Sequence, residues 1–342
     1  GLMRSTLNAI RKHPLLKIEL IVTGTHFSKK FGYTVNEIIK DGFKIHKVKI
    51  LDVKDELSML KSFSEGVVRI SKVLKKINPD ILLIEGDRYE ALSATIGGAF
   101  LGIPIAHVSG GDVSGSIDDS IRHSITKFAD IHFPGTDKSA ERVIKMGEDP
   151  KNVFMVGTPG IERSRLGKKQ IIKKFGDPAI LVVQHSVTTE IPEAGFQMRE
   201  TMRAVSELGM DTIVVYPNSD PGSKHVIKEI EKYKNNKNIK VYKNIPRDYF
   251  LGLMDNVSVM VGNSSAGITE APLFNLPVVN IGSRQKGRER AHNIYDVGHD
   301  HKKIIAIIRK ILDRKEKKSS SPYSGEGTPE KIAEILSKVK LK

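Results

Sequence analysis

Acidic side chains gather at turns in the first half of the chain. Asp112 lies in a glycine-rich loop after the apolar run that ends at Val108, and Asp118 and Asp119 stand where the next helix should begin. Asp87 occupies the matching turn after an earlier apolar run. Carboxylates that share a poorly hydrated site push at least one pKa upward, which provides an acid and a base near neutral pH. Helix capping is the alternative for these residues, and the residue types leave both roles open.

A second polar turn, in the last third of the chain, has the features of an anion-binding site. The apolar run Val257–Val261 indicates a buried strand, Gly262 permits a sharp turn, and Asn263, Ser264 and Ser265 are good helix caps. Unpaired backbone N–H groups and the positive end of a helix dipole attract anions at such a place. An ordinary helix cap is the alternative.

A basic run follows the next expected strand, Pro277–Ile281. Its cations would close over a diphosphate from the other side, and a solvated face is the alternative. They are Arg284, Lys286, Arg288 and Arg290. Glu270 is an acid beside these bases, which suits the hydroxyl groups of a ribose.

Other polar residues also follow apolar strands. His185 does so in the second half of the chain, either as a structural histidine or as a neutral or cationic group touching a leaving phosphate. Asn218 offers an amide donor in a turn, and Arg88 can pair with Asp87 or meet a phosphate. His26 ends the first such turn and Ser109 opens the glycine-rich loop.

Composition excludes several kinds of protein. The chain has 342 residues, a formal net charge of +15 and no cysteine, so disulfides and thiolate chemistry are excluded. The histidines are scattered and no dinucleotide or P-loop glycine pattern occurs, so we expect neither a metal nor a cofactor. No apolar stretch approaches the roughly 20 residues of a membrane span and no signal peptide is present, which favours a cytoplasmic protein. The basic excess lies in scattered lysines, so we expect an anionic small ligand rather than nucleic acid.

Strands and helices alternate along the chain, which predicts an α/β protein with two Rossmann-like parallel-sheet domains and a cleft between them. The expected strands of the first series are Ile18–Thr23, Lys47–Leu51, Ile81–Glu85, Pro104–Val108, Ile131–Pro134 and Val153–Val156. Those of the second are Ala179–Gln184, Thr212–Tyr216, Lys240–Tyr242, Val257–Val261 and Val278–Ile281.

Domain boundaries follow from where this alternation breaks. We expect an N-terminal domain over residues 1–160 and a C-terminal, ligand-binding domain over 161–320. Residues 321–342 would form a linker and a last helix, from Thr328 to about Val339. The chain opens on an amphipathic helix, so we also expect a first strand and its loop to be missing before it.

Several of these turns together resemble the hydrolysing UDP-N-acetylglucosamine 2-epimerases of nonulosonic and sialic acid biosynthesis. The likeness runs in order over nearly the whole chain. The motifs are Gly86-Asp-Arg-Tyr-Glu90, His107-Val-Ser-Gly-Gly-Asp112, Ile117-Asp-Asp-Ser-Ile-Arg-His123, Gln184-His-Ser-Val-Thr-Thr189, Gly262-Asn-Ser-Ser265 and Gly282-Ser-Arg-Gln-Lys-Gly-Arg288.

The resemblance implies a fold, a reaction and an assembly. The fold is of the glycosyltransferase-B type, with the last helix returning to the first domain. UDP would be eliminated from UDP-N-acetylglucosamine to give a 2-acetamidoglucal, and water addition would then yield N-acetylmannosamine. The partner is therefore a UDP-sugar, and a homodimer or homotetramer is expected.

The resemblance also assigns roles to residues. Asp87 and Asp118 match catalytic carboxylates and His185 matches a histidine near the UDP. Asp112 keeps a carboxylate in the glycine-rich loop. The UDP-binding set that it implies is Ser264, Ser265, Glu270 and Arg284, joined by Asn218 and Arg88, and Glu270 would take the ribose hydroxyls.

One departure bears on the substrate. Where many members have Glu, this chain has Ser109, in the pattern His-Val-Ser-Gly-Gly-Asp. A related branch acts on UDP-N,N'-diacetylbacillosamine, so this second substrate stays open. A glycosyltransferase of the same fold and a non-catalytic nucleotide-sugar sensor are further alternatives.

Overall fold

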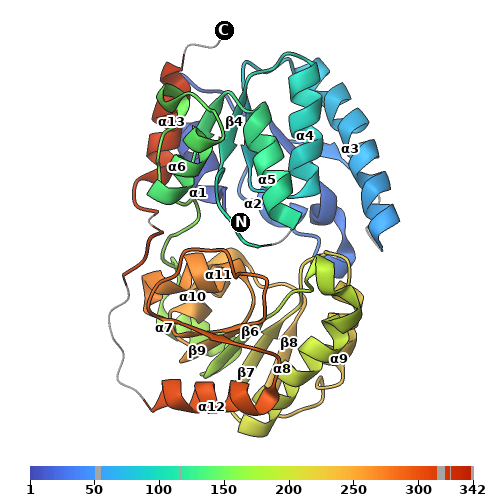
Figure 1. Ribbon diagram of the computed structural model, residues 1–342, viewed down its shortest axis with the longest axis vertical. Helices are drawn as coiled ribbons and strands as arrows, with labels where there is room; N and C mark the ends of the chain where they lie inside the picture. Colours follow the sequence, from blue (N-terminus) through green and yellow to red (C-terminus); the bar gives the residue numbers. More distant parts are fainter. Residues whose placement is uncertain (51–54, 116, 314–319, 324, 340–342) are drawn as a thin grey trace.

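Two lobes, each built on parallel strands, stand one above the other in a computed structural model of the chain (Figure 1). The structure describes residues 1–50, 55–115, 117–313, 320–323 and 325–339. The first lobe carries strands β1 to β5 and the second carries β6 to β11. The predicted α/β fold with two parallel-sheet domains is therefore confirmed.

The first lobe contains two small parallel sheets. Strand β1 pairs with β2, and β3, β4 and β5 pair in that order. Their bounds are Leu20–Thr23, Ile45–Val48, Leu82–Glu85, Ile105–Val108 and Ile131–Phe133. A cavity of about 360 Å³ with mainly apolar walls lies between β1 and β3. Both sheets point the carboxyl ends of their strands toward the second lobe, so their polar turns meet there.

The second lobe is one six-stranded parallel sheet in the order β11-β10-β9-β6-β7-β8. The inner strands β6, β9 and β10 are buried along their whole length, as expected where helices cover both faces of a parallel sheet. In chain order, β6 to β11 span Ile180–Val183, Thr212–Val215, Ile239–Tyr242, Val259–Gly262, Val278–Ile281 and Ile294–Val297.

Helices cover the sheets of both lobes, and some of them begin at side-chain caps. Asp55 and Ser58 form a capping box before α3, and Asp300 caps α12. In chain order, α1 to α13 span Arg4–Lys12, Val35–Lys40, Glu56–Ile77, Tyr89–Phe100, Ile117–Phe128, Asp137–Lys145, Lys168–Phe175, Ala194–Leu208, Ser223–Glu231, Arg247–Met254, Ser265–Thr269, His301–Leu312 and Thr328–Lys338.

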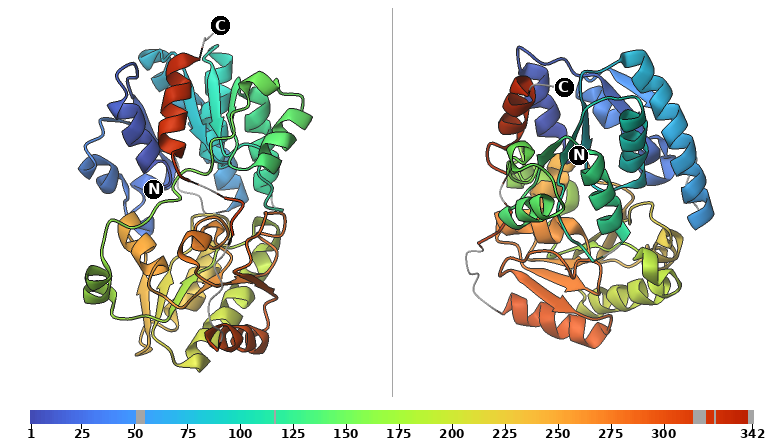
Figure 2. Two further views of the ribbon diagram at one scale, coloured as in Figure 1. Left: turned by 90° about the vertical axis from the view of Figure 1, so that its left-hand side faces the viewer. Right: turned by 45° about the horizontal axis from the view of Figure 1, so that its top comes forward.

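The last helix, α13, packs on the first lobe beside α1, although α12 before it covers the second lobe (Figures 1 and 2). Its Ile332 is fully buried in a cluster with residues of β4 and β5, including Val108 and Phe133. The hydroxyl of Thr328 donates to the Val156 carbonyl at 2.7 Å, which fixes the start of the helix.

Several expected strand limits differ from the observed ones. Strand β2 spans Ile45–Val48 rather than Lys47–Leu51, and residue 51 lies outside the described residues. The expected strand Val153–Val156 is reduced to a single bridge between Val153 and His132. Strand β11 was not predicted, because its sequence Ile-Tyr-Asp-Val is short and has a charged residue.

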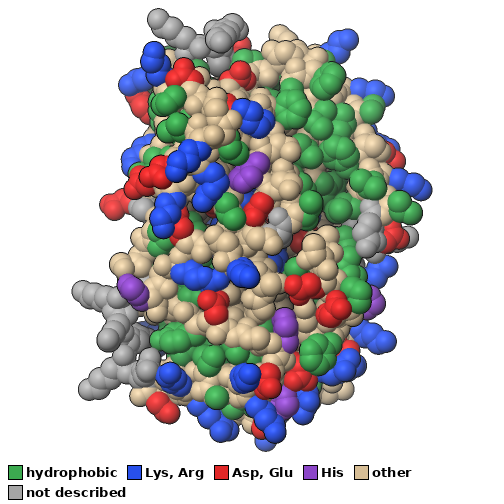
Figure 3. All heavy atoms as spheres, viewed as in Figure 1, with side chains coloured by type: hydrophobic (Ala, Val, Ile, Leu, Met, Phe, Trp, Pro, Cys, Tyr) green, Lys and Arg blue, Asp and Glu red, His purple; other side chains and the backbone are tan. Residues whose placement is uncertain are grey.

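The surface charge agrees with a solvated exterior. Figure 3 shows Lys and Arg side chains spread over the visible face and mixed with acidic ones, not gathered in one stripe. None of the described helices has the length and apolar character needed to cross a membrane.

Candidate functional site

A cavity of about 600 Å³ lies between the lobes and takes its walls from both. Among the predicted site residues, those that line it are His26, Asp87, Arg88, Ser109, Asp112, Ser265 and Glu270. Glu85 and Arg122 also line the cavity, and sequence reasoning did not select them. Arg288 lines it too and was named only as part of the basic run. The cavity therefore joins the acidic turns of the first lobe to the Ser-rich turn of the second.

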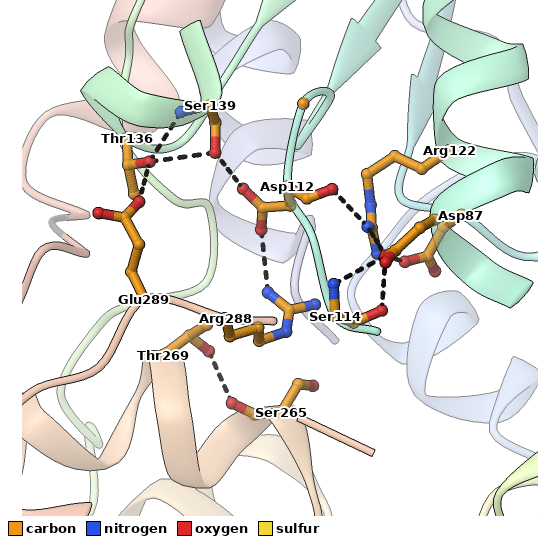
Figure 4. Close-up of polar contacts among 12 residues, drawn as sticks. Asp87, Asp112, Ser114, Arg122, Thr136, Ser139, Ser265, Thr269, Arg288 and Glu289 are labelled. Carbon is orange, nitrogen blue, oxygen red and sulfur yellow. Dashed lines mark hydrogen bonds and ion pairs between the residues drawn. The ribbon is translucent and has the colours of Figure 1, made fainter. Parts of the chain in front are cut away.

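Arg122 of α5 organises the acidic side of the cavity (Figure 4). Its side chain is only 2 % exposed and pairs with Asp87, while its Nη1 donates to Asp119 Oδ1 at 2.8 Å and to the Asp112 carbonyl at 2.7 Å. A buried guanidinium needs such partners, because an uncompensated buried charge is costly. One cation thus ties the turn of Asp87 and the glycine-rich loop of Asp112 to α5.

Asp112 connects the two lobes. One of its carboxylate oxygens accepts from Ser139 at 2.7 Å and the other pairs with Arg288 of the second lobe at 2.9 Å. Figure 4 shows this carboxylate between the two donors, with Thr136 and Glu289 making a further contact across the lobes nearby. Asp112 therefore sits at the boundary where ligand and both lobes would meet.

Glu85, at the end of β3, is an acid that sequence reasoning missed. Burial and the neighbouring Asp87 raise the pKa of Glu85 to about 7. The sequence placed the raised carboxyl pKa among the acids of the turns, whereas the raised pKa belongs to Glu85, a residue assigned to a strand, and burial is its main cause. Its position at a strand end, two residues before Asp87, was the available signal.

Local contacts fix the turn that carries Asp87. Gly86 has φ +81°, and its carbonyl lies 2.9 Å from Nε2 of the buried His107 on β4. Ser109 also has a positive φ, +63°, and its backbone N–H donates to the Phe133 carbonyl at 3.0 Å. These bonds hold the loop ends of β3 and β4 side by side at the cavity.

His185 and Asn263 clasp each other in the second lobe. The His185 N–H donates to Asn263 Oδ1 at 2.7 Å, and Asn263 Nδ2 donates to the His185 carbonyl at 2.9 Å. His185 Nδ1 accepts the Asn218 N–H at 3.0 Å, which places the proton of the neutral ring on Nε2. Burial and Arg284 lower the pKa of His185 to about 3. Of the two protonation states considered from sequence, the neutral one is present near pH 7.

Arg88 and Arg284 converge near this histidine. Arg88 Nη1 lies 3.2 Å from Asp220 Oδ1, and Arg284 Nη2 lies 3.9 Å from Asp220 Oδ2. Arg284 also donates to the Asn263 carbonyl at 3.3 Å. Arg88 also lies 3.2 Å from Glu90, so it pairs with Glu90 and Asp220 rather than with Asp87.

The helix after β9 is shorter than the sequence predicted. Ser264 caps α11 by accepting from the Ala266 N–H at 3.3 Å, but α11 ends at Thr269 and a 3₁₀ turn follows. Five helical residues add up to a small dipole, so free N–H groups and cations carry more of any anion binding there. Glu270 is 4 % exposed and pairs with Arg247 at 2.5 Å.

The basic run does not act as one group, contrary to expectation. Arg284 turns to Asp220, Arg288 crosses to Asp112, and Arg290 pairs with Asp296 at 2.6 Å on β11. Lys286 lines a separate surface pocket with Arg290.

Two predicted residues stand at the margin of the site. Asp118 is partly buried in the first turn of α5, whereas its neighbour Asp119 makes the contact to Arg122. His26 lines the cavity and its Nδ1 lies 2.8 Å from the Thr34 hydroxyl. Over the part of the chain that the structure describes, no group of three or more His, Cys, Asp or Glu residues could hold a metal ion.

Comparisons with known proteins agree with this geometry. Residues 8–337 match the model of a family described as UDP-N-acetylglucosamine 2-epimerase. A UDP-N,N'-diacetylbacillosamine 2-epimerase (hydrolyzing) from Legionella pneumophila is 34 % identical over 100 % of this chain and 93 % of its own length. A UDP-N-acetylglucosamine 2-epimerase from Neisseria meningitidis is 32 % identical over 98 % and 91 %.

The fold has a close counterpart among solved structures. The UDP-GlcNAc 2-epimerase of Methanocaldococcus jannaschii, in complex with UDP-GlcNAc and UDP, superposes with a TM-score of 0.81. The match covers 98 % of this chain and 95 % of that one at 19 % identity, so it establishes the fold alone.

Proposed function

The chain belongs to the UDP-N-acetylglucosamine 2-epimerase family, and from this premise we propose that it is a hydrolysing 2-epimerase that converts UDP-N-acetylglucosamine to N-acetylmannosamine and UDP. The observation that carries the proposal is the cavity between the lobes. Glu85, Asp87 and Asp112 of the first lobe line one wall, and Ser265, Glu270 and Arg288 of the second lobe line the other. A sugar beside the acids of the first lobe and a diphosphate beside Ser265 and Arg288 fit this arrangement.

The reaction proceeds in two stages. A carboxylate of the first lobe takes the C2 proton while the C1–O bond breaks and its electron pair leaves with UDP. Water then adds its oxygen to C1 of the 2-acetamidoglucal, and C2 receives a proton on the opposite face. Asp87 is the carboxylate closest to Arg122, and Asp118 is the second candidate. One base and one acid meet the requirement for proton removal and return.

The second lobe stabilises the leaving diphosphate. The Nε2–H of neutral His185, the helix start at Ser264 and the guanidinium of Arg284 supply donors where negative charge develops. Fixed donors of this kind contribute on the order of 3 kcal/mol each to the rate. Glu270, already held by Arg247, accepts from the ribose hydroxyls.

A second substrate is favoured by a specific observation. The Legionella relative, 34 % identical, is named for UDP-N,N'-diacetylbacillosamine, and this chain has Ser109 in the cavity wall. Incubation with each UDP-sugar alone, without an acceptor, tests both. Release of UDP with the 2-epimerised sugar supports the proposal and identifies the substrate. An intact donor sugar in both reactions would instead favour a transferase or a sensor.

We also propose that the chain forms a homodimer through the first lobe. Apolar side chains gather over α3 and α4 in Figure 3, and those of Leu57, Leu60 and Phe100 are 72 %, 59 % and 86 % exposed. Such a patch on a protein surface commonly marks an interface. Light scattering of wild-type protein and of Phe100→Asp tests this, since the variant should be shifted to monomer.

A further inference from the structure

Asp220 occupies the point where two arginines converge. Its carboxylate lies 3.2 Å from Arg88 Nη1 and 3.9 Å from Arg284 Nη2, and Asn218 Nδ2 donates to it at 2.5 Å. No predicted role fell on Asp220, which follows β7 in the turn Tyr216-Pro-Asn-Ser-Asp220. Its surroundings are those of a bound anion: two cations and an amide donor around one carboxylate.

The contact spans the two lobes. Arg88 occupies the position just before α4 in the first lobe, whereas Asp220 belongs to the second lobe. Arg88 Nη2 also donates to the Ser219 hydroxyl at 3.3 Å. A single guanidinium from the first lobe therefore reaches the loop of Asn218, whose backbone N–H donates to His185.

The charges at this point are balanced before any ligand binds. Burial acts to raise the pKa of Asp220, but Arg88 and Arg284 outweigh it and hold that pKa below its usual range. Two arginines thus face two carboxylates, Asp220 and Glu90, while His185 is neutral. A diphosphate would bring further negative charge into a partly buried site, where repulsion by a fixed carboxylate is poorly screened.

We propose that Asp220 is an internal counter-anion, which the diphosphate of the ligand displaces from Arg88 and Arg284. In the free protein the carboxylate neutralises the charge of both arginines and holds Arg88 across the lobes. On binding, the guanidinium groups exchange carboxylate oxygens for phosphate oxygens, and the exchange reverses when the diphosphate leaves. This inference rests on the proposed function for the identity of the ligand.

Asp220→Asn tests the competition, because it removes the charge and keeps the shape. Titration calorimetry with UDP at low ionic strength should show roughly three- to tenfold tighter binding than wild type, within the range of close charge pairs. The gain should shrink at high salt. Inorganic pyrophosphate should show the same direction of change, since the effect lies at the phosphates.

Asp248→Asn is the matched control. Asp248 also forms an ion pair between the lobes, with Arg4 at 3.0 Å, but it is not in the group around Asp220. The affinity of the Asp248→Asn variant for UDP should equal that of the wild-type protein. Equal or weaker UDP binding by Asp220→Asn than by wild type overturns the proposal and makes Asp220 a positioning residue for Arg88.

A structure of the wild-type protein with UDP provides a test that does not depend on the variant folding. Arg88 and Arg284 on phosphate oxygens and off Asp220 support the exchange, and an intact Arg88–Asp220 pair overturns it. Turnover is a separate readout. If UDP binds and Asp220→Asn tightens it while no UDP-sugar reacts, the counter-anion stands and the epimerase proposal fails. If UDP does not bind, both fail.

Discussion

At the scale of single residues, the site combines acids of unlike environments. Burial and Asp87 raise the pKa of Glu85 to about 7, so Glu85 titrates near neutral pH. Asp119 is the opposite case: burial acts to raise its pKa, but Ser114, the Gly115 N–H and Arg122 outweigh burial and lower it. Acids whose pKa values are shifted in opposite directions can be in different protonation states at one pH.

Asp118 and Asp119 are adjacent but should respond differently to substitution. Asp119 accepts from the Ser114 N–H at 2.7 Å, the Gly115 N–H at 2.8 Å and Arg122. We expect Asp119→Asn to lower the free energy of unfolding by about 1–3 kcal/mol. Asp118→Asn should instead lower turnover by about 10²-fold or more while UDP binding and stability persist. Urea unfolding, calorimetry and product assays check this, and retained turnover in Asp118→Asn removes it from the mechanism.

Glu85 should make stability depend on pH. Its folded pKa of about 7 lies above the ordinary 4.5, so the proton stabilises the folded state fully below about pH 4.5. This contribution is lost as pH rises through 7. Wild type should therefore lose up to about 3 kcal/mol relative to Glu85→Gln between pH 4.5 and pH 8. Urea unfolding of both proteins across this range measures the difference, and parallel pH curves would contradict it.

At the scale of elements, strand ends and helix starts hold the site together. The clasp between His185 and Asn263 ties the end of β6 to the end of β9, which are paired neighbours in the sheet. Arg122 does the same for the turns around β3 and β4 from its place on α5. The proposed site residues are therefore positioned by buried polar contacts that span neighbouring elements.

Arg122→Met should be strongly destabilising, because it leaves Asp87 and Asp119 without their cation. Breaking a buried ion pair by removing one partner costs about 3–5 kcal/mol. Arg69→Met is the control: Arg69 pairs with Glu65 at 3.1 Å on the exposed side of α3 and should change stability by less than about 1 kcal/mol. Thermal and urea unfolding compare the two, and similar losses would contradict the role given to Arg122.

Gly262 is required at the end of β9. It has φ +132°, and an added Cβ would collide with the Val183 carbonyl of β6. Gly262→Ala should cost about 3 kcal/mol or more and distort the turn to Asn263. Gly298→Ala is the matched control, since its Cβ would meet no atom within 4 Å. Urea unfolding and UDP titration report both effects, and equal stability of the two variants would contradict them.

At the scale of the whole molecule, the lobes meet largely through charged and polar side chains. Arg4 with Asp248, Arg88 with Asp220 and Arg288 with Asp112 cross the boundary at 3.0, 3.2 and 2.9 Å. Ionic contacts at a partly exposed boundary weaken with salt, unlike an apolar core. The relative position of the lobes should therefore respond to ionic strength and to ligand.

Small-angle scattering tests this response. The radius of gyration of the ligand-free protein should rise as salt is raised from about 0.05 to about 0.5 M, because the Debye length shortens roughly threefold over this range. Saturating UDP should reverse the rise, because a bound diphosphate supplies the site arginines with a new anion. A radius of gyration that is constant under all conditions would show that the lobes form one rigid unit.

How much the sequence predicts follows from what decides each feature. Apolar runs such as β6 and β10 predict the strands, and polar turns at their ends predict several residues of the cavity wall, including Asp87, Asp112 and Glu270. Partners distant in sequence decide the rest. Arg122 was not selected because its partners lie in two separate turns as well as on α5 itself, and the basic run splits because its members meet different neighbours. Short β11 lacks an apolar pattern, and the domain limits at residues 160 and 320 stay predictions.

Because α13 is built into the core of the first lobe, the polypeptide passes between the lobes once after β5 and once more after α12. Two covalent crossings restrict the lobes more than one would. They permit a swing about the line joining the crossings and oppose twisting or wholesale separation. With this topology the cleft between the lobes can open repeatedly and return to the same closed arrangement.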